Sequence, residues 1–379
     1  MALKNFAFKI LSKDKFARCG LIETHRGNIN TPAFMPVGTQ ATIKACTIDD
    51  IKKTGSEIIL SNTYHLMERP GKDIIASLGG LRSFMGWDGP ILTDSGGFQV
   101  MSLKNMAKID NNGVTFKSHL DGSIIRLTPK DSIAMQKALD STITMAFDEC
   151  TSYPVTHDIA SKSMELSMQW AKICRKEFID REGYGLFGIV QGSTFIDLRN
   201  ISSETLIDIG FDGYAIGGLA VGEGHEEMIK TLKASISYLP ESSPRYLMGV
   251  GYPKDIIEAV RLGVDMFDCV IPTRSGRTGK VFTKRGSLNI KNARHKNDPR
   301  PIEENCSCPV CSNNVSRAYL YHLFNTKEML GTSYLTLHNI NHYLKLMENL
   351  REAIRNNNYD ETAEMLLNQY KVGDIEIYN

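Results

Sequence analysis

The stretch Met266-Phe267-Asp268-Cys269-Val270-Ile271-Pro272-Thr273-Arg274-Ser275-Gly276-Arg277 joins a short apolar run to a carboxylate and then to a segment with two arginines. The residues before Asp268 have the apolar character of a buried strand, while Pro272 and Gly276 indicate a loop after it. The stretch therefore predicts a strand that ends at an acid and is followed by a basic loop. Taken alone, Asp268 more simply caps a turn or pairs with Arg274.

Seven similar apolar runs precede this strand and alternate with amphipathic segments, which is typical of repeated βα units. The expected strands are 33–37, 57–61, 90–94, 143–148, 186–191, 213–217, 245–249 and 264–268. The expected helices are 47–54, 129–139, 157–181, 226–239 and 253–262. Eight strands over about 240 residues have the size and rhythm of a (β/α)8 TIM barrel. A doubly wound open sheet is the alternative, but no Gly-x-Gly-x-x-Gly turn follows the first strand.

Three regions divide the chain in this interpretation. Residues 1–30 predict antiparallel strands packed on the barrel, and residues 31–295 form the catalytic barrel. A hairpin insertion near 114–127 turns at Asp121-Gly122. Residues 296–379 form a zinc-binding subdomain with helical stretches at 316–330 and 338–354, and its end from 359 onward predicts one more helix and a frayed terminus.

The composition indicates a globular protein with no global preference for nucleic acid. The 379 residues are 42% hydrophobic and 23% charged, with a net charge of +1. An RNA partner would therefore need a local basic patch, which the segment 273–300 supplies. The amino terminus lacks the unbroken apolar core of a secretion signal, and no stretch reaches membrane-spanning length. Together with scattered single cysteines, this predicts a cytoplasmic protein without membrane contact.

Polar residues stand at the carboxyl ends of the expected strands, where barrel enzymes place their reacting groups. Asp94, Asp148 and Asp268 each end a strand, and Gln191 ends another. For a single aspartate a turn cap is the better interpretation, but three such strand ends favour a shared pocket. Carboxylates that accept from a ring N–H, and amide donors from Gln191 and the Gly218 backbone, suit a flat ligand such as guanine.

A cysteine cluster gives the most specific signal in the chain. Cys306, Cys308 and Cys311, followed by His338, supply the three thiolates and one imidazole of a closed tetrahedral zinc site. His322 and His342 are competing candidates for the fourth ligand. Because a closed site leaves no position for substrate, one structural Zn²⁺ is expected.

Several long motifs identify the chain as similar to a known family. They are Pro36-Val37-Gly38-Thr39-Gln40-Ala41-Thr42, Asn62-Thr63-Tyr64-His65-Leu66, Thr93-Asp94-Ser95-Gly96-Gly97-Phe98-Gln99, Ala146-Phe147-Asp148-Glu149-Cys150, Gly217-Gly218-Leu219-Ala220-Val221-Gly222-Glu223 and the cysteine cluster. In this order, across nearly the whole chain, they closely resemble bacterial tRNA-guanine transglycosylase. The resemblance implies a (β/α)8 barrel with a zinc subdomain. It also implies exchange of guanine 34 in GU(N) anticodons for 7-aminomethyl-7-deazaguanine (preQ1), in queuosine biosynthesis.

The resemblance also implies roles for individual residues. Asp268 would be the nucleophile that forms a covalent ribosyl intermediate, and Asp94 the general acid and base. The implied substrate-binding residues are Asp94, Ser95, Gly96, Gly97, Phe98, Asp148, Cys150, Gln191, Gly218, Leu219, Glu223 and Met248. The implied RNA-binding residues are Gly249, Val250, Gly251, Tyr252, Pro253, Lys254, Asp255, Thr273, Arg274, Ser275, Gly276 and Arg277. The implied partners are tRNA, guanine, preQ1 and a second copy of the chain in a homodimer.

Three rival functions fit the sequence less well. A non-catalytic tRNA-binding subunit would be expected to lack the nucleophile, whereas Asp94 and Asp268 are both present. An archaeal-type transglycosylase would need an added carboxy-terminal RNA-binding domain, and a zinc hydrolase would need an open metal position. The departures from the family pattern, at Phe98, Glu68, Tyr252, Thr278 and Lys280, do not involve the reacting groups.

Overall fold

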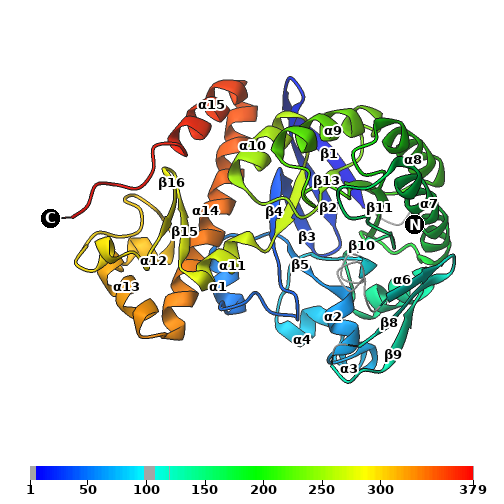
Figure 1. The fold of residues 1–379 in the computed structure, drawn as a ribbon, viewed down its shortest axis with the longest axis horizontal. Helices are drawn as coiled ribbons and strands as arrows, with labels where there is room; N and C mark the ends of the chain where they lie inside the picture. Colours follow the sequence, from blue (N-terminus) through cyan, green and yellow to red (C-terminus); the bar gives the residue numbers. More distant parts are fainter. Residues whose placement is uncertain (1–5, 98–106, 119, 379) are drawn as a thin grey trace.

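The fold is a mixed α/β barrel with a smaller carboxy-terminal region beside it (Figure 1). A computed structural model describes residues 6–97, 107–118 and 120–378. Among these residues no helix combines the length and apolar character needed to cross a bilayer.

Eight parallel strands form the barrel, which confirms the predicted fold class. They are β4 (Ala33–Pro36), β5 (Ile59–Ser61), β6 (Ile91–Thr93), β10 (Ile143–Met145), β11 (Gly185–Val190), β12 (Gly213–Ile216), β13 (Arg245–Leu247) and β14 (Met266–Cys269). Each strand pairs with its neighbours in chain order, and β14 returns to pair with β4. A parallel bridge from Val37 to Leu60 joins β4 to β5, so the sheet is nearly closed.

Alternation along each strand separates the barrel interior from its outer face. Met266 packs in an inner cluster to which all eight strands contribute, whereas Phe267 packs in a second cluster shared with the surrounding helices. Because side chains alternate with period two, Asp268 faces the same side as Met266 and stands at the mouth. Leu92 in the inner cluster precedes Asp94 by two residues in the same way, and Ile189 precedes Gln191.

Helices cover the outer face of the barrel (Figure 1). The five expected helices are present as α1 (Ile48–Lys53), α6 (Pro129–Ala138), α7 (His157–Glu177), α9 (His225–Tyr238) and α10 (Pro253–Arg261). Thr47 caps α1 and Thr128 caps α6, each with an aspartate three residues later that completes a capping box. The sequence analysis did not assign α2 (Thr63–Glu68), α3 (Lys72–Ser77), α4 (Gly80–Met85) or α8 (Ile196–Ile209).

Two small antiparallel sheets lie against the barrel. The first joins β1 (Ala7–Asp14), β2 (Ala17–Thr24) and β3 (Gly27–Thr31), and Phe6 beside it packs edge-on against Phe187 of the barrel interior. The second joins β7 (Ala107–Asp110) to the predicted hairpin, β8 (Gly113–Lys117) and β9 (Ile124–Leu127). The first sheet thus adds its apolar side chains to the barrel core.

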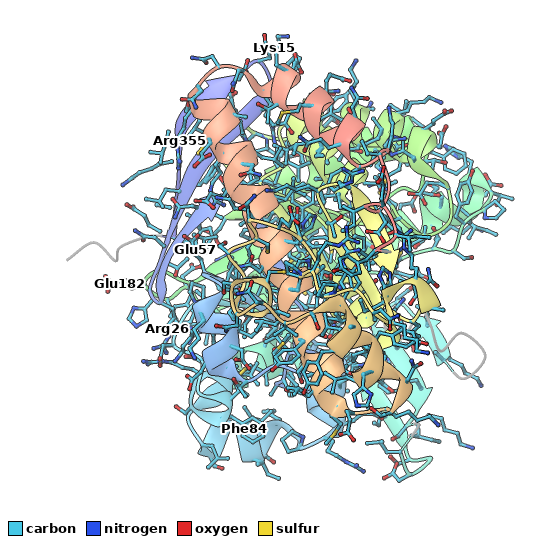
Figure 2. The ribbon with its side chains drawn as sticks, turned by 90° about the vertical axis from the view of Figure 1, so that its left-hand side faces the viewer. Lys15, Arg26, Glu57, Phe84, Glu182 and Arg355 are labelled. Carbon is cyan, nitrogen blue, oxygen red and sulfur yellow. The ribbon has the colours of Figure 1, made fainter. Side chains whose placement is uncertain are left out.

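The carboxy-terminal region is built around one long helix. Its elements are α11 (Ile271–Thr278), β15 (Lys280–Thr283), β16 (Gly286–Asn289), η2 (Ala293–His295), α12 (Pro309–Ser312), α13 (Arg317–Asn325), α14 (Met329–Arg355) and α15 (Tyr359–Gln369). Helix α14 runs from this region across the barrel, beside the first strands of the chain (Figure 2). It therefore couples the cysteine cluster to the barrel.

The chain from residue 371 to 378 forms no helix or strand, but arginine side chains hold parts of it. The side chain of Arg317 bonds Asp374 at 2.9 Å, and Arg300 donates to the Glu376 carbonyl at 2.8 Å. Arg285 likewise donates to the Gly373 carbonyl at 2.9 Å. Arg285 and Arg300, two arginines of the basic patch expected at 273–300, thus hold the chain's own end.

Candidate active site at the barrel mouth

A cavity of about 510 Å³ opens at the carboxyl ends of the barrel strands. The predicted site residues that line it are Asp94, Ser95, Asp148, Cys150, Gln191, Gly218, Leu219, Met248, Gly249, Val250, Gly251, Tyr252, Asp255, Asp268 and Arg274. Residues almost 180 positions apart in sequence therefore share one pocket, as the alignment of parallel strand ends predicts.

Asp268 is held by one of its two carboxylate oxygens. The Tyr246 hydroxyl donates to Oδ1 at 2.6 Å, and the Gly249 backbone N–H donates to the same oxygen at 2.8 Å. No described residue donates a hydrogen bond to Oδ2. Burial raises the pKa of Asp268 above its ordinary value, and the two hydrogen bonds oppose that shift. The arrangement fixes the carboxylate while leaving one oxygen able to react.

Asp94 is fixed by the motif that follows β5. Asn62 donates from its side-chain amide to Oδ2 at 2.5 Å, and the Thr63 backbone N–H donates to Oδ1 at 2.7 Å. The Thr63 hydroxyl donates to the Asp94 carbonyl at 2.5 Å. These contacts tie β6 to the start of α2, so the carboxylate has a defined orientation in the cavity.

Asp148 lies between two side chains that the sequence also placed in the site. Ser95 donates to its Oδ1 at 2.9 Å, and Gln191 donates to its Oδ2 at 2.8 Å. Burial raises the pKa of Asp148 to about 6, and the nearby Asp94 charge acts in the same direction. A group with this pKa is mainly ionised at neutral pH, so it can accept hydrogen bonds from a ligand.

Two glycines at or beside the cavity wall are explained by close approach of neighbouring atoms. A Cβ on Gly218 would lie 2.6 Å from Oε1 of Gln191, and Gly218 has a positive φ of 66°. A Cβ on Gly97 would lie 2.3 Å from the Asp148 carbonyl oxygen. Glycine at these positions lets the loops after β6 and β12 pack against the strand ends beside them.

Several predicted residues lie beside the cavity lining and not in it. Glu223 accepts hydrogen bonds from the backbone N–H groups of Ala220 and Val221, and so holds the loop that lines the pocket. The others outside the lining are Gly96, Gly97, Pro253, Lys254, Thr273, Ser275, Gly276 and Arg277. Phe98 lies outside the described residues.

The segment after Asp268 is a helix, which corrects the expected loop. Pro272 stands in the first turn of α11. Backbone N–H groups in the first turn have no partner within the helix, so the missing N–H of proline costs no hydrogen bond there. Gly276 faces α14, because a Cβ there would lie 2.6 Å from the Thr336 backbone nitrogen. The exposed side of the helix carries Arg274 and Arg277. The two residues interpreted as loop signals thus permit a helix and its close packing.

Three residues that fix the carboxylates were not assigned roles from the sequence. Tyr246 precedes the end of β13 by one residue, and Asn62 and Thr63 follow β5. Tyr246 packs in the barrel interior, so its hydroxyl end points toward the mouth. From the sequence alone, an inward-facing tyrosine near the end of a strand is only a weak sign of an active-site role. An ordinary place in the apolar core explains it equally well.

The cysteine cluster forms a group that can hold a metal ion. The ligand atoms of Cys306, Cys308, Cys311 and His338 all lie within 4.8 Å of one another. The Sγ atoms lie 3.9, 3.3 and 3.4 Å from Nδ1 of His338, in that order. Zinc bond lengths in a tetrahedron place sulfur and nitrogen ligands about 3.5 Å apart, so the set fits.

The surroundings of His338 favour metal binding through Nδ1. Its Nε2 lies 2.9 Å from the carbonyl oxygen of Phe282 and donates to it, which leaves Nδ1 facing the thiols. The competing candidates are elsewhere. His342 bonds the Tyr370 hydroxyl at 3.2 Å, and His322 is exposed.

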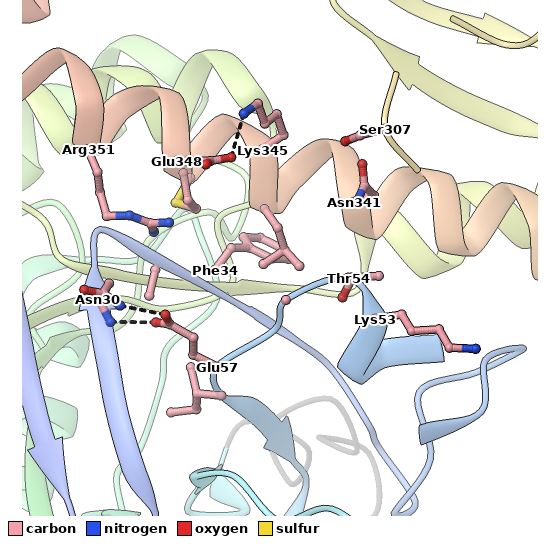
Figure 3. Close-up of a pocket in the computed structure, with 15 residues that line it drawn as sticks. Asn30, Phe34, Lys53, Thr54, Glu57, Ser307, Asn341, Lys345, Glu348 and Arg351 are labelled. Carbon is pink, nitrogen blue, oxygen red and sulfur yellow. Dashed lines mark hydrogen bonds and ion pairs between the residues drawn. The ribbon is translucent and has the colours of Figure 1, made fainter. Parts of the chain in front are cut away.

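A second cavity of about 390 Å³ lies at the opposite ends of β4 and β5 (Figure 3). Glu57 in its wall accepts from the backbone and side chain of Asn30, both at 2.6 Å. Glu348 pairs with Lys345 at 2.7 Å. None of the predicted site residues lines this cavity, so the barrel mouth remains the candidate active site.

The fold and the residues at the barrel mouth indicate a class of enzyme. A closed parallel barrel with oriented carboxylates at its strand ends is the arrangement of (β/α)8-barrel enzymes. One oxygen of Asp268 accepts no hydrogen bond from a described residue, and Asp94 and Asp148 line the same cavity.

Comparison with known proteins assigns the family. The family model described as queuine tRNA-ribosyltransferase matches residues 13–372. A queuine tRNA-ribosyltransferase of Granulibacter bethesdensis is 55% identical over 374 residues, which cover 99% of each chain. One from Rickettsia akari is 54% identical over 353 residues, covering 93% of this chain and 98% of its own. The chain belongs to the queuine tRNA-ribosyltransferase family, which confirms the resemblance seen in the motifs.

Proposed function

We propose that this protein exchanges guanine 34 in GU(N) anticodons for preQ1 through a covalent intermediate on Asp268. The broader activity, transfer of a tRNA ribosyl group from guanine in queuosine synthesis, follows from its family. The covalent mechanism is supported above all by the hydrogen bonds of Asp268. Both of its hydrogen bonds reach Oδ1, so Oδ2 is available for bond formation.

In the first step, Oδ2 of Asp268 attacks the ribose C1′ and the bond from C1′ to N9 of guanine breaks. The electron pair of that bond goes to the base, and Asp94 supplies the proton that neutralises it. The carboxylate of Asp268 is now joined to C1′, so the tRNA remains attached to the protein. Tyr246 and Gly249 keep Oδ1 in place while Oδ2 changes its bonding.

In the second step, Asp94 takes the proton from N9 of the incoming base, and that nitrogen attacks C1′. The bond from C1′ to Asp268 breaks and its electron pair restores the carboxylate. Two displacements at one carbon return the original stereochemistry, as in retaining glycosidases. A base takes the place of water, so the cavity must exclude solvent while the intermediate persists.

The hydrogen-bonding edge of the base would be recognised by the other polar groups of the cavity. Asp148 would accept from the ring N–H and the exocyclic amine, while Gln191 and the Gly218 backbone face the carbonyl oxygen. Gln191 already donates one N–H to Asp148 at 2.8 Å, so its second N–H is the one left for the base. Met248 would pack on a ring face, and Leu219 with the loop held by Glu223 would sense the aminomethyl group.

The RNA would lie over α11 and the loop after β13. Arg274 lines the cavity and Arg277 is exposed on the same helix, so both can contact the backbone of the anticodon loop. Guanine must leave the stack to reach the pocket. The thiolate and imidazole cluster would hold one structural Zn²⁺, and we propose a homodimer acting in the cytoplasm.

A trapping experiment tests the covalent intermediate. The protein is mixed with a GU(N) tRNA and 9-deazaguanine, which can fill the pocket but has carbon in place of the attacking nitrogen. A protein–RNA band that survives denaturant is expected for the wild type and absent for Asp268→Asn, which should also lose guanine exchange. Full exchange by this variant would exclude Asp268 as nucleophile. A wild type without the band would favour a tRNA-binding subunit that does no chemistry.

The preference for preQ1 over queuine is a separate part of the proposal. Cys150 and Val221 line the cavity. Both resemble the bacterial version of the family, so queuine should be incorporated much more slowly than preQ1. Equal incorporation of the two free bases into the same tRNA would contradict this preference.

A further inference from the structure

One buried charge at the barrel mouth has no role in the mechanism above. Arg199, in the first turn of α8, has no exposed surface. Its Nε donates to the Ser193 carbonyl at 2.7 Å, and Nη1 donates to the Val190 carbonyl at 3.3 Å. Its Nη2 has no hydrogen-bond partner among the described residues. A buried guanidinium with an unmet donor is costly and calls for an explanation.

The position of this guanidinium links it to the base-binding wall. A Cβ on Gly218 would lie 3.5 Å from Nη2 of Arg199 and 2.6 Å from Oε1 of Gln191. Gly218 and the Gln191 side chain, the two residues proposed to bind the base carbonyl, thus lie beside the buried cation. Arg199 is not in the cavity lining, so it would act through this wall.

The guanidinium of Arg199 is charged at neutral pH and has no ion-pair partner in the described part of the chain. Burial lowers the pKa of Arg199 to about 10, which leaves the guanidinium protonated at neutral pH. None of the ion pairs formed by described residues includes it. Cys150 and Glu223, which belong to the pocket or its loop, raise this pKa and so oppose the effect of burial. The guanidinium therefore acts on the cavity, where the Glu223 carboxylate compensates part of its charge without pairing with it.

We infer that Arg199 is a positioning and specificity residue that makes the pocket prefer a base with a carbonyl oxygen facing Gly218. The inference rests on the proposed function, in which that oxygen belongs to guanine or preQ1. A cation behind the wall stabilises the partial negative charge of a carbonyl oxygen and disfavours the partial positive charge of an amino group. In a water-poor pocket such a fixed charge discriminates more strongly than it would in solvent.

The two backbone contacts alone do not require an arginine. One neutral donor could satisfy the Ser193 carbonyl, which already receives the shorter of the two bonds. The guanidinium adds a permanent charge and an extra N–H directed at the wall. Charge, and not shape, is thus the property to test.

The experiment compares guanine with 2-aminopurine, which keeps the ring and the amine but lacks the carbonyl oxygen. The KM of guanine and the inhibition constant of 2-aminopurine are measured in the tRNA exchange reaction for wild type, R199Q and R199K. Arg26→Gln is the matched control, because Arg26 is a half-buried arginine paired with Asp140 at 2.5 Å, far from the mouth in the fold. Circular dichroism and thermal melting establish that each variant is folded.

R199Q should raise the guanine KM about tenfold, as expected for losing one charge-assisted interaction, and leave the 2-aminopurine constant nearly unchanged. R199K should keep most of the guanine affinity because it keeps the charge, and Arg26→Gln should change neither constant. The inference would be overturned if R199Q weakened the binding of both bases equally or did not weaken the binding of guanine. It would also be overturned if R199K were as impaired as R199Q. A wild type that exchanges no guanine would instead overturn the proposed function on which it rests.

Discussion

At the scale of single residues, the structure explains how one carboxylate can be held firmly and still react. Both hydrogen bonds to Asp268 end on Oδ1, one from a tyrosine of the barrel interior and one from a backbone N–H. The Tyr246 hydroxyl is itself buried, and its pKa is raised well above the ordinary value by burial and by Asp268. It therefore remains a proton donor over the working pH range, so Asp268 keeps its orientation.

Tyr246→Phe should slow the exchange without preventing base binding. The loss of one hydrogen bond to a charged group is worth about 1.5–3 kcal/mol, which corresponds to roughly a tenfold to hundredfold lower kcat. The KM of guanine should change little, because Tyr246 bonds the proposed nucleophile Asp268 and none of the residues proposed to bind the base edge. Single-turnover kinetics with labelled guanine measure both quantities. An unchanged kcat would show that the Gly249 N–H alone positions Asp268.

Asp148 should make base binding and stability depend on pH in opposite directions. Its pKa is raised from 3.8 to about 6, so the folded protein holds this proton more tightly than the unfolded chain does. As pH rises from 3.8 toward 6, the fold loses stability by up to about 3 kcal/mol from this group, and the loss is complete above pH 6. Base binding needs the carboxylate, so it should strengthen over the same range.

Asp148→Asn separates these two effects. At pH 7 the variant should melt at a higher temperature than the wild type, because it removes a buried charge, while its guanine KM should rise strongly. At pH 4.5 the difference in melting temperature should largely vanish. Calorimetry at the two pH values with parallel KM measurements tests this, and a lower melting temperature for the variant at pH 7 would contradict the assigned shift.

At the scale of elements, the contact between α11 and α14 sets the position of the exposed Arg274 and Arg277, which we propose contact RNA. Asn339 of α14 donates to the carbonyl of Pro272 in the first turn of α11 at 3.0 Å and to that of Lys280 just after the helix at 3.1 Å. Gly276 allows the two helices to approach until a Cβ would be 2.6 Å from backbone. The close contact exists because this position carries no side chain.

Gly276→Val should displace α11 and weaken tRNA binding more than base binding. Overpacking of this kind costs about 1–3 kcal/mol of stability, because backbone cannot yield as a flexible side chain can. We expect a higher KM for tRNA with a nearly unchanged KM for guanine. Thr278→Ala, at an exposed position of the same helix, is the control and should behave like the wild type. Equal loss for both substrates would indicate general misfolding in place of a local shift.

At the scale of the whole molecule, the cysteine cluster fastens the carboxy-terminal region to the barrel. Its histidine lies on α14, the helix that also packs on β4 and α11. Tyr343 of the same helix donates to the Gly251 carbonyl at 2.5 Å, and Gly251 lines the active-site cavity. His338 and Tyr343 lie five residues apart on α14, so a metal bound at His338 would steady the part of the helix that holds Gly251 of the cavity.

Cys308→Ser should remove the metal and lower the stability of the chain by several kcal/mol, because a closed site contributes its binding energy to folding. Metal content by mass spectrometry and thermal melting measure the two effects. Cys46→Ser, a partly buried thiol outside the group, is the control and should keep one metal ion per chain. Full metal content in Cys308→Ser would show that these four residues are not the ligands.

Local sequence patterns were sufficient for the eight strands and the metal group. Strand periodicity and strand-end polarity depend on neighbours along the chain, so Asp94, Asp148 and Asp268 could be placed at one mouth without coordinates. The helix at Ile271–Thr278 could not be recognised in the same way, because Pro272 and Gly276 favour a loop by local preference. Packing against Thr336, sixty residues later, reverses that preference.

The sequence by itself determined the barrel, the carboxylates at its mouth and the three thiols of the metal group, because periodicity and motif spacing are local properties. Tertiary structure alone decided which oxygen of Asp268 is held, which histidine joins the thiols, and where the buried charge of Arg199 lies. These depend on distances between residues far apart in the chain. Only folding brings Tyr246 to Asp268 and Arg199 behind Gly218, so no local pattern could have encoded either contact.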